Sequence, residues 1–562
     1  MYSNKQNVNI LTSLLIAKDI RKAVLCPGSR NIPIVANLLE TDEFECFPAT
    51  DERSAAFYAM GLALATQKPA IVCVTSGSAF LNTLPAMAEA FYRKAPVVLI
   101  SADRPKEWID RLDGQTMIQH GHYADIFKCE VDIDDFEDDA HGKADYCQML
   151  VNKALNAAVC DGMGPVHVNI HLNEPIFCFD HPNLPSVRNI IPKVSNCLNS
   201  ADIDGIIREF ISSGRNIIAI GQLTFHDSEF DRIIRQLSNR YIIIAENLST
   251  SSCTPFDRAL REFSESGSCM TIDYLLSFGG TFVSKKLKHF LRSHDIGAHC
   301  EINEEGMIHD TFSCQTSILK CNAKDFLVRL LSETQNAETP EVKIADAFKL
   351  TWDKCVGSVA DCIEGYVPKF SQMSVIRDFE RSLDDMYYDY EVHYANSMEV
   401  RIGCLYSSNY IWCNRGINGI EGSLSTAAGF SLATDKMVFC VIGDLSFFYD
   451  QNALWNSSLN GNFRVLLLNN SCGGIFSQLS GLNVSDKTMS FIEGRHKANA
   501  RGICEQNDIG YIAAQNSDEL RVGLVHFLTE QTSRPMVLEV FTSPDDDRDA
   551  FVELNNLINK KK

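Results

Sequence analysis

Short apolar runs rich in β-branched residues alternate with longer segments of helical pattern along this chain. The clearest runs are Ala70–Thr75, Pro96–Ile100, Val166–Ile170, Asn216–Ile220, Tyr241–Ala245, Met437–Ile442, Val465–Leu468 and Pro535–Val540. Such runs are typical of strands buried on both faces of a parallel sheet, with helices as the crossover connections. The pattern therefore predicts an α/β fold made of doubly wound parallel sheets.

The length of the chain, 562 residues, predicts three such domains in series, because one domain usually takes ~100–200 residues. Two polar stretches that contain proline are candidate boundaries, Asp180–Pro192 and Ser332–Pro340. We therefore expect domains at 1–185, 190–335 and 345–562. The first and third of these ranges hold nearly all of the glycine-rich and polar motifs.

The composition narrows the class of protein. Hydrophobic residues make up 45% of the chain and charged residues 22%, which is ordinary for a globular protein and speaks against a disordered or fibrous one. The formal net charge is −21, which argues against a nucleic-acid-binding protein, since such a protein needs a basic footprint. Because acidic residues outnumber basic ones, any cluster of arginines in this chain is a candidate functional feature.

The 20 cysteines are scattered along the chain. They lack the closely spaced pairs of zinc ribbons and thioredoxin-like motifs. The N-terminus does not have the pattern of a secretory signal, and no apolar stretch approaches the ~20 residues needed to span a bilayer. We therefore expect a cytoplasmic protein without a membrane span, whose thiols are mostly free and buried.

Polar residues follow two strand patterns in the C-terminal third. Asp444 follows the first strand directly, and Asn470 follows the second. Ligands of open α/β sheets bind at this end of the strands, and a carboxylate with an amide oxygen suits Mg²⁺. Three glycines would let the backbone approach a diphosphate closely: Gly443, Gly473 and Gly474. The alternative is two ordinary turns, because Asp and Asn favour turns.

This segment resembles the signature of enzymes that use thiamine diphosphate (ThDP), which starts as Gly-Asp-Gly, ends in Asn-Asn and surrounds one Mg²⁺ or Mn²⁺ ion. The resemblance implies that Asp444 and Asn470 are side-chain ligands of the metal and that the carbonyl of Cys472 is the third ligand. Leu445 stands where the signature usually has a second glycine after the aspartate. The cofactor-binding residues implied here are Gly443, Asp444, Leu445, Asn470 and Gly473.

Glu52 stands just before a helical pattern rich in small residues, Ala55–Ala65. Taken alone, it is a first-turn acid that complements the helix dipole. ThDP chemistry needs a carboxyl group beside the aminopyrimidine ring, in an apolar site that raises its pKa. The family supplies this group in a context like the Asp-Glu-Arg-Ser-Ala found here, so the resemblance implies that Glu52 is catalytic. It also implies that Ser76 and Gly77 lie against the pyrimidine and that Ile420 props the bent cofactor.

Further segments narrow the family: Leu25–Pro33, Thr75–Ala79, Ser101–Gln119 and Asn414–Thr426. In this order they resemble the 2-succinyl-5-enolpyruvyl-6-hydroxy-3-cyclohexene-1-carboxylate (SEPHCHC) synthases, the ThDP enzymes of menaquinone biosynthesis, over essentially the whole chain. The resemblance implies decarboxylation of 2-oxoglutarate and addition of the succinyl-carbanion equivalent to isochorismate. Two subunits build each site in this superfamily, which implies a homodimer and leaves a tetramer open.

Both implied substrates are dicarboxylates, so this acidic chain must build a local positive pocket, for which arginine is suited. The resemblance assigns four arginines to it: Arg30, Arg104, Arg401 and Arg415. It assigns three polar substrate contacts: Ser29, Gln115 and Ser397. Gln115 is also a catalytic candidate, since it can hydrogen-bond the isochorismate ring or the reacting intermediate. Lys285 is the basic contact expected from the middle domain, with the adjacent Lys286 as its alternative.

Three other kinds of protein are alternatives to this interpretation. An acetolactate-synthase-like enzyme usually carries FAD on its middle domain, but 190–335 has no dinucleotide fingerprint, so no FAD is expected. An oxalyl-CoA-decarboxylase-like enzyme would need an adenine-nucleotide site there. A regulatory homologue without turnover would have no use for Glu52, Asp444 and Asn470 together. His167 and His171 share one strand face, but no third metal ligand is apparent, so we interpret this strand as structural.

Overall fold

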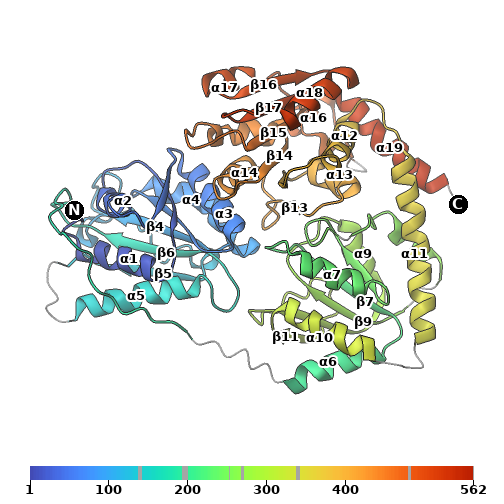
Figure 1. Cartoon of the computed structure of the whole chain (residues 1–562), viewed down its shortest axis with the longest axis horizontal. Coiled ribbons are helices and arrows are strands. Elements are labelled where there is room, and N and C mark those ends of the chain that lie inside the picture. The colour runs from blue at the N-terminus through green and yellow to red at the C-terminus, as the bar shows by residue number, and fades with distance from the viewer. Residues whose placement is uncertain are drawn as a thin grey trace.

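The computed structural model describes residues 1–136, 142–192, 200–251, 253–267, 271–336, 342–478 and 482–560. Their strands form three sheets of six, five and six strands, which follow one another along the chain (Figure 1). Every ladder between the named strands is parallel. The predicted α/β fold of parallel sheets in series is confirmed. Residues 337–340 of the second candidate boundary lie outside the described residues.

The N-terminal sheet has the order β2-β1-β3-β4-β6-β5. Successive residues of its strands enter different cores: Val24 packs on the side of α3, whereas Ala23 and Leu25 pack with α1 and α2. This explains why its strands read as continuous apolar runs. The elements are α1 Gln6–Ala17, β1 Lys22–Leu25, α2 Ile32–Leu39, β2 Glu45–Pro48, α3 Glu52–Thr66, β3 Ala70–Val74, α4 Ser78–Arg93, β4 Val97–Asp103, β5 Cys129–Ile133, α5 Lys143–Ala157 and β6 Val166–His171.

The middle sheet has the order β11-β10-β9-β7-β8. One face is covered by α6, α7 and α10, and the other by α8 and α9, whose core continues into α11 and the C-terminal unit. The elements are α6 Ser200–Ser212, β7 Asn216–Ile220, α7 Ser228–Leu237, β8 Ile242–Ala245, α8 Ala259–Glu265, β9 Thr271–Phe278, α9 Lys285–Ser293, β10 Asp295–Asn303, β11 Ser317–Lys320 and α10 Ala323–Asn336.

The C-terminal sheet has the order β13-β12-β14-β15-β17-β16. In Figure 1 the long helix α11 runs beside the middle unit toward this sheet. The elements are α11 Val342–Gly365, α12 Gln372–Asp384, β12 Tyr390–Tyr394, α13 Met398–Tyr406, β13 Ile411–Trp412, α14 Ser423–Ser431, β14 Met437–Gly443, α15 Asp444–Tyr449, β15 Phe463–Asn469, α16 Asp486–Ile492, α17 Arg501–Gln506, β16 Gly510–Ala514, α18 Ser517–Thr529, β17 Met536–Phe541 and α19 Pro544–Lys560.

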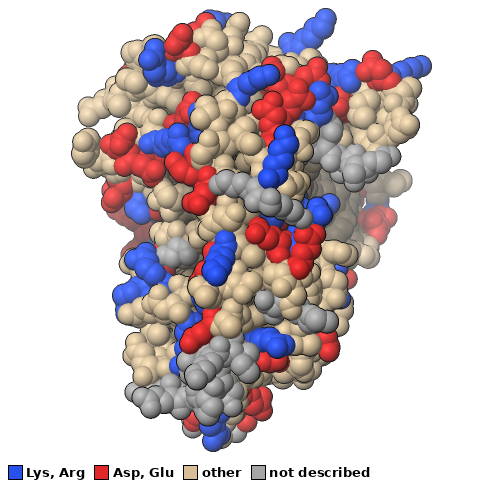
Figure 2. Space-filling view, turned by 90° about the vertical axis from the view of Figure 1, so that its right-hand side faces the viewer, with Lys and Arg blue, Asp and Glu red and all other residues tan. Residues whose placement is uncertain are grey.

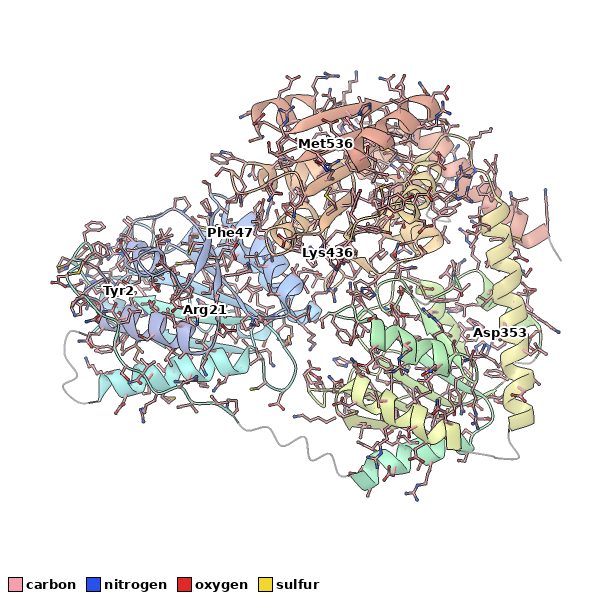
Figure 3. The ribbon with its side chains drawn as sticks, in the orientation of Figure 1. Tyr2, Arg21, Phe47, Asp353, Lys436 and Met536 are labelled. Atoms are coloured by element: carbon pink, nitrogen blue, oxygen red, sulfur yellow. The ribbon has the colours of Figure 1, made fainter. Side chains whose placement is uncertain are left out.

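The first and third sheets share one apolar core, in which α3 packs against α14. Two glycines allow this approach: a Cβ on Gly61 would lie 2.1 Å from the carbonyl oxygen of Thr426, and one on Gly429 would lie 2.3 Å from that of Tyr58. Phe47, which belongs to the same core, is labelled in Figure 3 on the side of the N-terminal unit toward the C-terminal one. The core therefore fixes these two units against each other.

Acidic and basic side chains are interspersed on the face that Figure 2 shows. Among the described residues, no helix has the length and apolar character that a membrane span requires. All the cysteines that the structure describes are free thiols.

Candidate active site

The two strands of the C-terminal motif end side by side. β14 and β15 pair in parallel with Gly443 opposite Leu468, so the residues that follow both strands meet at one edge of the sheet. Asp444 and Asn470 are each only 3% exposed there. The backbone N–H of Asn470 donates to Oδ2 of Asp444 at 3.1 Å. The structure thus brings the two predicted metal ligands together.

The side chain of Asn470 is held in one orientation by α19. Its Nδ2 donates to Oδ2 of Asp547 at 2.8 Å, and its Oδ1 accepts from the backbone N–H of Cys472 at 3.2 Å. Asp547 in turn accepts from the N–H of Gln372 at 2.7 Å and from the hydroxyl of Thr542 at 3.0 Å. Sequence reasoning missed Asp547, because it lies in an acidic run at a helix start, where acids are expected for the dipole alone.

The donors at this edge fit a hard divalent cation. Carboxylate, amide and carbonyl oxygens are the ligands that Mg²⁺ and Mn²⁺ prefer. Burial, and to a lesser degree the charge of Glu493, raises the pKa of the Cys472 thiol to about 12, and sulfur is in any case a soft ligand that hard cations such as Mg²⁺ do not prefer. The group that Cys472 can offer to such a cation is therefore its backbone carbonyl.

Three buried carboxyl groups gather at this edge: Glu399, Asp444 and Asp547. Burial, with the neighbouring charges of Asp444 and Asp547, raises the pKa of Glu399 to about 8, and burial raises the pKa of Asp547 to about 6. A Cβ on Gly443 would lie 2.3 Å from Oε1 of Glu399, so a larger residue there would require this carboxyl group to move. A cation among these groups would favour their charged forms.

His496 is a further neighbour of Asp444 that the sequence did not indicate. Its Nδ1 accepts from the N–H of Ala498 at 3.1 Å, which assigns the ring proton to Nε2. That Nε2 lies 3.3 Å from Oδ2 of Asp444. His496 is therefore placed to stabilise the charge of this carboxylate.

The loops that follow β1 and β3 pack together at the carboxyl edge of the N-terminal sheet. A Cβ on Gly28 would lie 2.4 Å from Cβ of Thr75. Gly77 has φ +76°, and a Cβ on it would lie 3.2 Å from the carbonyl oxygen of Gln115. The predicted contacts near Ser29, Ser76 and Gln115 thus belong to one region. Ser76 is buried there, whereas the side chains of Ser29 and Gln115 are less enclosed in this single chain.

Two of the predicted arginines are neighbours in this region. Arg30 is 1% exposed, donates to the carbonyl oxygen of Leu172 at 3.0 Å and forms an ion pair with Glu174 at 2.9 Å. Burial, followed by the positive charge of Arg104, lowers the pKa of Arg30. The buried Nε of each arginine has no hydrogen-bond partner within the described chain. An anion placed between them would therefore be stabilised.

Glu52 begins α3, and Asp51 caps that helix by accepting from the N–H groups of Arg53 at 2.9 Å and Ser54 at 3.4 Å. The carboxylate of Glu52 is thus not needed as the cap. It accepts a hydrogen bond from Nδ2 of Asn82 at 3.2 Å and is half-buried in this chain.

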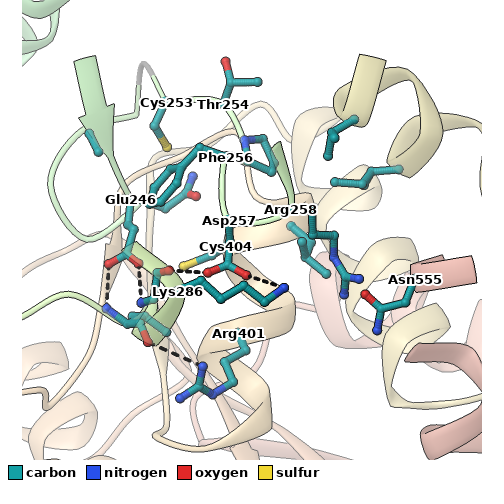
Figure 4. A pocket seen from close by; sticks show the side chains of 18 of the residues that line it. Glu246, Cys253, Thr254, Phe256, Asp257, Arg258, Lys286, Arg401, Cys404 and Asn555 are labelled. Carbon is teal, nitrogen blue, oxygen red and sulfur yellow. Dashed lines mark hydrogen bonds and ion pairs between the residues drawn. The ribbon is translucent and has the colours of Figure 1, made fainter. Parts of the chain in front are cut away.

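The other two predicted arginines lie near each other, between the middle and C-terminal units. The positive charge of Arg415 contributes to the lowered pKa of Arg401, after burial, which is the larger cause. Arg415 is 8% exposed and donates to Oδ1 of Asn396 at 3.1 Å. Arg401 donates to the carbonyl oxygen of Val283 at 3.4 Å (Figure 4). Neither arginine forms an ion pair with a carboxylate of the described chain.

Ser397, at the start of α13, has φ +87° although it is not a glycine. Residues held in such sparsely populated backbone conformations cluster at functional sites. Glu89 of α4 holds the turn after Arg415, because its carboxylate accepts from the N–H groups of Gly416 and Ile417, both at 2.7 Å. Sequence reasoning missed Glu89, which lies inside a helix and gives no local signal.

A cavity of about 270 Å³ adjoins Arg401, and its lining also includes Arg258, Lys286 and Asn555 (Figure 4). Lys286 forms an ion pair with Asp257 at 3.3 Å. Lys285 is exposed at the start of α9. The third lysine of this helix, Lys288, is partly buried, and its pKa is lowered by burial and by the charge of Arg415.

The remaining predicted residues lie around the sheet edge that carries Asp444 and Asn470. Ile420 is 42% exposed, and its carbonyl oxygen accepts from the hydroxyl of Ser446 at 2.6 Å. Leu445 donates its N–H to Oδ1 of Asp444 at 2.7 Å. The N–H of Gly473 donates to the carbonyl oxygen of Glu493 at 2.7 Å.

The predicted residues thus form separate groups in this chain. Helix α13 connects two of these groups, because Glu399 faces the sheet edge that carries Asp444 and Asn470, whereas Arg401 faces Arg415. Within the described residues, Glu52 and Arg30 make no hydrogen bond or ion pair to either of these groups.

The histidines of β6 are engaged within the fold. His167 bonds Glu130 at 3.0 Å and Ser101 at 2.7 Å. His171 lies with Asp132 and Asp134 in a group close enough to share a metal ion. However, Nζ of Lys106 lies 2.8 Å from Asp132 and 2.7 Å from Asp134, so an ammonium group already forms ion pairs with both carboxylates.

Two family profiles match the parts of the chain that carry these groups. Residues 7–127 match the thiamine pyrophosphate enzyme, N-terminal TPP binding domain. Residues 398–540 match the thiamine pyrophosphate enzyme, C-terminal TPP binding domain.

Proteins from several bacteria that carry the name 2-succinyl-5-enolpyruvyl-6-hydroxy-3-cyclohexene-1-carboxylate synthase match the chain over nearly its full length. That of Phocaeicola vulgatus is 36% identical over 97% of both chains. That of Bacteroides fragilis is 37% identical over 99% of this chain and 100% of its own. That of Desulfotalea psychrophila is 33% identical over 96% of this chain and 99% of its own. The chain therefore belongs to the SEPHCHC synthase family of ThDP-dependent enzymes.

Proposed function

We propose that this chain decarboxylates 2-oxoglutarate and adds the succinyl unit to isochorismate, giving SEPHCHC and carbon dioxide in menaquinone biosynthesis. One observation of the fold carries the proposal: Arg401 and Arg415 lie near each other without an ion-pair partner in the described chain, and Arg401 shares helix α13 with Glu399, which faces Asp444. Such a positive pocket in a chain of net charge −21 suits dicarboxylate substrates. The names of the similar proteins support the same activity.

ThDP, when bound, supplies the electron sink for decarboxylation of a 2-oxo acid. Asp444, Asn470 and the carbonyl of Cys472 would hold Mg²⁺ or Mn²⁺, and Gly443, Leu445 and Gly473 would line the diphosphate. Two hydrogen bonds keep this edge ordered before any ligand arrives: Asp547 fixes Asn470, and the N–H of Leu445 fixes Asp444. Preorganised oxygen ligands lower the cost of capturing the cation.

Glu52 would hold a proton at the aminopyrimidine ring, next to Ser76 and Gly77, and Ile420 would support the bend of the cofactor. Because Asp51 already caps α3, the carboxyl group of Glu52 is available for this task.

The substrate carboxylates would bind Arg401 and Arg415 on one side and Arg30 and Arg104 on the other. Ser29, Ser397 and Gln115 would orient the substrates, and Gln115 would reach the reacting centre. Lys285, or Lys286 beside it in the cavity lining, would supply the basic contact from the middle unit.

The finer assignments belong to the same proposal. Glu52 and Ile420 are not enclosed in the single chain, which supports a homodimer that covers each site with a second subunit, with a tetramer also open.

The ranges 1–185, 190–335 and 345–562 would act as the pyrimidine-binding, central and diphosphate-binding domains. The free thiols of the described cysteines support a reducing, cytoplasmic setting.

The second candidate is an acetolactate-synthase-like enzyme acting on pyruvate. The test is to incubate the full-length chain with ThDP, Mg²⁺, isochorismate and either 2-oxoglutarate or pyruvate, and to identify the product by mass spectrometry. We expect SEPHCHC from 2-oxoglutarate only, and no product when ThDP is omitted. Acetolactate from pyruvate alone would replace the proposal by the second candidate.

A further inference from the structure

Residues that follow the carboxyl ends of strands in the middle sheet form hydrogen bonds to the C-terminal unit, so this edge of the sheet is not open. Parallel sheets usually bind their ligands at this edge. Here Nε2 of Gln222, after β7, donates to the carbonyl oxygen of Cys413 at 2.7 Å. The hydroxyl of Thr281, after β9, donates to the carbonyl oxygen of Arg415 at 2.7 Å. These residues therefore hold the segment that carries Arg415.

Asn247, after β8, makes the same kind of contact. Its Nδ2 donates to the carbonyl oxygens of Ser407 at 2.8 Å and Asn409 at 3.0 Å, and its own carbonyl oxygen accepts from the N–H of Ile411 at 2.8 Å. All three strands at this end of the sheet are thus used as supports for the C-terminal unit.

Glu246 stands between these supports and fixes the loop 281–284. Its Oε2 accepts from the N–H of Val283 and its Oε1 from the N–H of Ser284, both at 2.8 Å (Figure 4). The same loop touches both arginines of the positive pocket, because Thr281 bonds Arg415 and the carbonyl oxygen of Val283 accepts from Arg401. One buried carboxylate therefore holds the loop that contacts both arginines.

The charge of Glu246 also faces the pocket. The side chain is 6% exposed. Burial raises the pKa of Glu246 to about 7, although the N–H groups of Val283 and Ser284 and the charge of Arg415 favour its charged form. Burial and the charge of Arg415 lower the pKa of Arg401, and the charge of Glu246 acts against that lowering. A buried carboxylate with two amide donors makes strong, directional, charge-assisted bonds. This arrangement stabilises one position of the loop and hence of the arginines.

We infer that Glu246 is a positioning residue, which sets the spacing of Arg401 and Arg415 for dicarboxylate substrates through the loop 281–284. The inference rests on the proposed function, because it needs these arginines to bind the substrate. Glu246 follows its strand directly, as Asp444 follows β14, but its two oxygens are used within the protein and are not free for a ligand.

The test compares the steady-state kinetics of Glu246→Gln with those of the unchanged enzyme. Glutamine keeps an acceptor for one of the two backbone N–H groups and turns a donor toward the other, so the loop is released without a large change in volume. We expect KM for 2-oxoglutarate or isochorismate to rise about tenfold, with kcat within about twofold. Thr281→Val removes only the bond to Arg415 and should raise the same KM about threefold.

Glu301→Gln is the matched control. Glu301 is a buried glutamate of β10 in the same sheet, and it bonds Asn303 at 3.1 Å and His309 instead of the loop 281–284. It should lose stability without a change in KM. The double variant Glu246→Gln with Thr281→Val should raise KM by less than the product of the single effects, because both act through one loop.

An unchanged KM in a folded, active Glu246→Gln variant would overturn the inference, as would an equal rise in KM in Glu301→Gln. If the proposed function itself is wrong, the unchanged enzyme will turn over neither 2-oxoglutarate nor isochorismate in the same assay. That result is distinct from both outcomes above.

Discussion

Asp547 in α19 and Asn470 after β15 are joined by a hydrogen bond of 2.8 Å from Nδ2 of Asn470 to Oδ2 of Asp547. This bond decides which end of the Asn470 side chain is oxygen and which is nitrogen. With Nδ2 committed to Asp547, Oδ1 faces the loop of Cys472. The helix α19 thus orients one of the proposed metal ligands.

Replacing Asp547 by alanine should weaken metal binding more than catalysis. Asn470 would be free to turn its amide, and loss of such a supporting partner typically costs roughly 10- to 100-fold in metal affinity. The Mg²⁺ concentration for half-maximal ThDP-dependent activity should rise by that factor, with activity recovered at high Mg²⁺. Asp545→Ala, on the same helix turn but 78% exposed in its side chain, should change nothing. An unaltered Mg²⁺ requirement in Asp547→Ala would disprove the orienting role.

Glu52→Gln should abolish turnover and leave ThDP binding largely intact, because the amide cannot supply the proton that the aminopyrimidine needs. Turnover and ThDP affinity, the latter by calorimetry, are measured on the same preparation. Glu43→Gln is a suitable control, since Glu43 is exposed and its only ion pair among the described residues is with Arg21. Near-normal turnover of Glu52→Gln would rule out its role in cofactor activation.

Arg415→Ala should chiefly impair the use of a dicarboxylate. Loss of a charge-assisted contact corresponds to a rise in KM of roughly 10- to 100-fold. Arg381→Ala, an exposed arginine paired with Glu364, serves as the control for loss of a positive charge. Saturation by both substrates at unchanged concentrations would exclude the proposed pocket.

The buried Glu380 predicts how stability depends on pH. Its carboxylate accepts from the hydroxyl of Tyr394 at 2.5 Å, and burial raises its pKa to about 7. Because the folded pKa lies above the unfolded value, the folded state binds this proton more tightly. Its contribution to the free energy of unfolding is therefore full below about pH 4.5 and is lost as pH rises to about 7.

In Glu380→Gln this loss should be absent, so the free energy of unfolding should fall by about 3 kcal/mol less between pH 5 and pH 8 than in the unchanged protein. The free energy of unfolding in denaturant is measured at pH 5 and pH 8 for both proteins. Equal slopes for the two would show that Glu380 does not titrate in this range.

Much of the fold follows from the strand patterns, because parallel strands buried on both faces carry their signal in the apolar runs themselves. The predicted run Asn216–Ile220 is β7, and Met437–Ile442 lies within β14. The pairing of Asp444 with Asn470 was predictable for the same reason, since both follow adjacent parallel strands. β13, only Ile411–Trp412, is too short to give such a pattern.

The supporting carboxylates could not be predicted in the same way. Glu89, Glu399 and Asp547 sit on helices and are buried only because distant segments pack over them. Their partners are far along the chain, such as Gly416 for Glu89, so no local spacing indicates them. Glu246 is the exception, because a polar residue directly after a buried strand is a signal that the sequence does contain.

Release of carbon dioxide from 2-oxoglutarate tests the central claim most directly. The full-length chain is assayed with ThDP and Mg²⁺, with and without isochorismate. We expect release that depends on ThDP and reaches its full rate only with isochorismate. Turnover of pyruvate in place of 2-oxoglutarate, or no turnover of 2-oxoglutarate despite tight binding of ThDP, would contradict the proposed function.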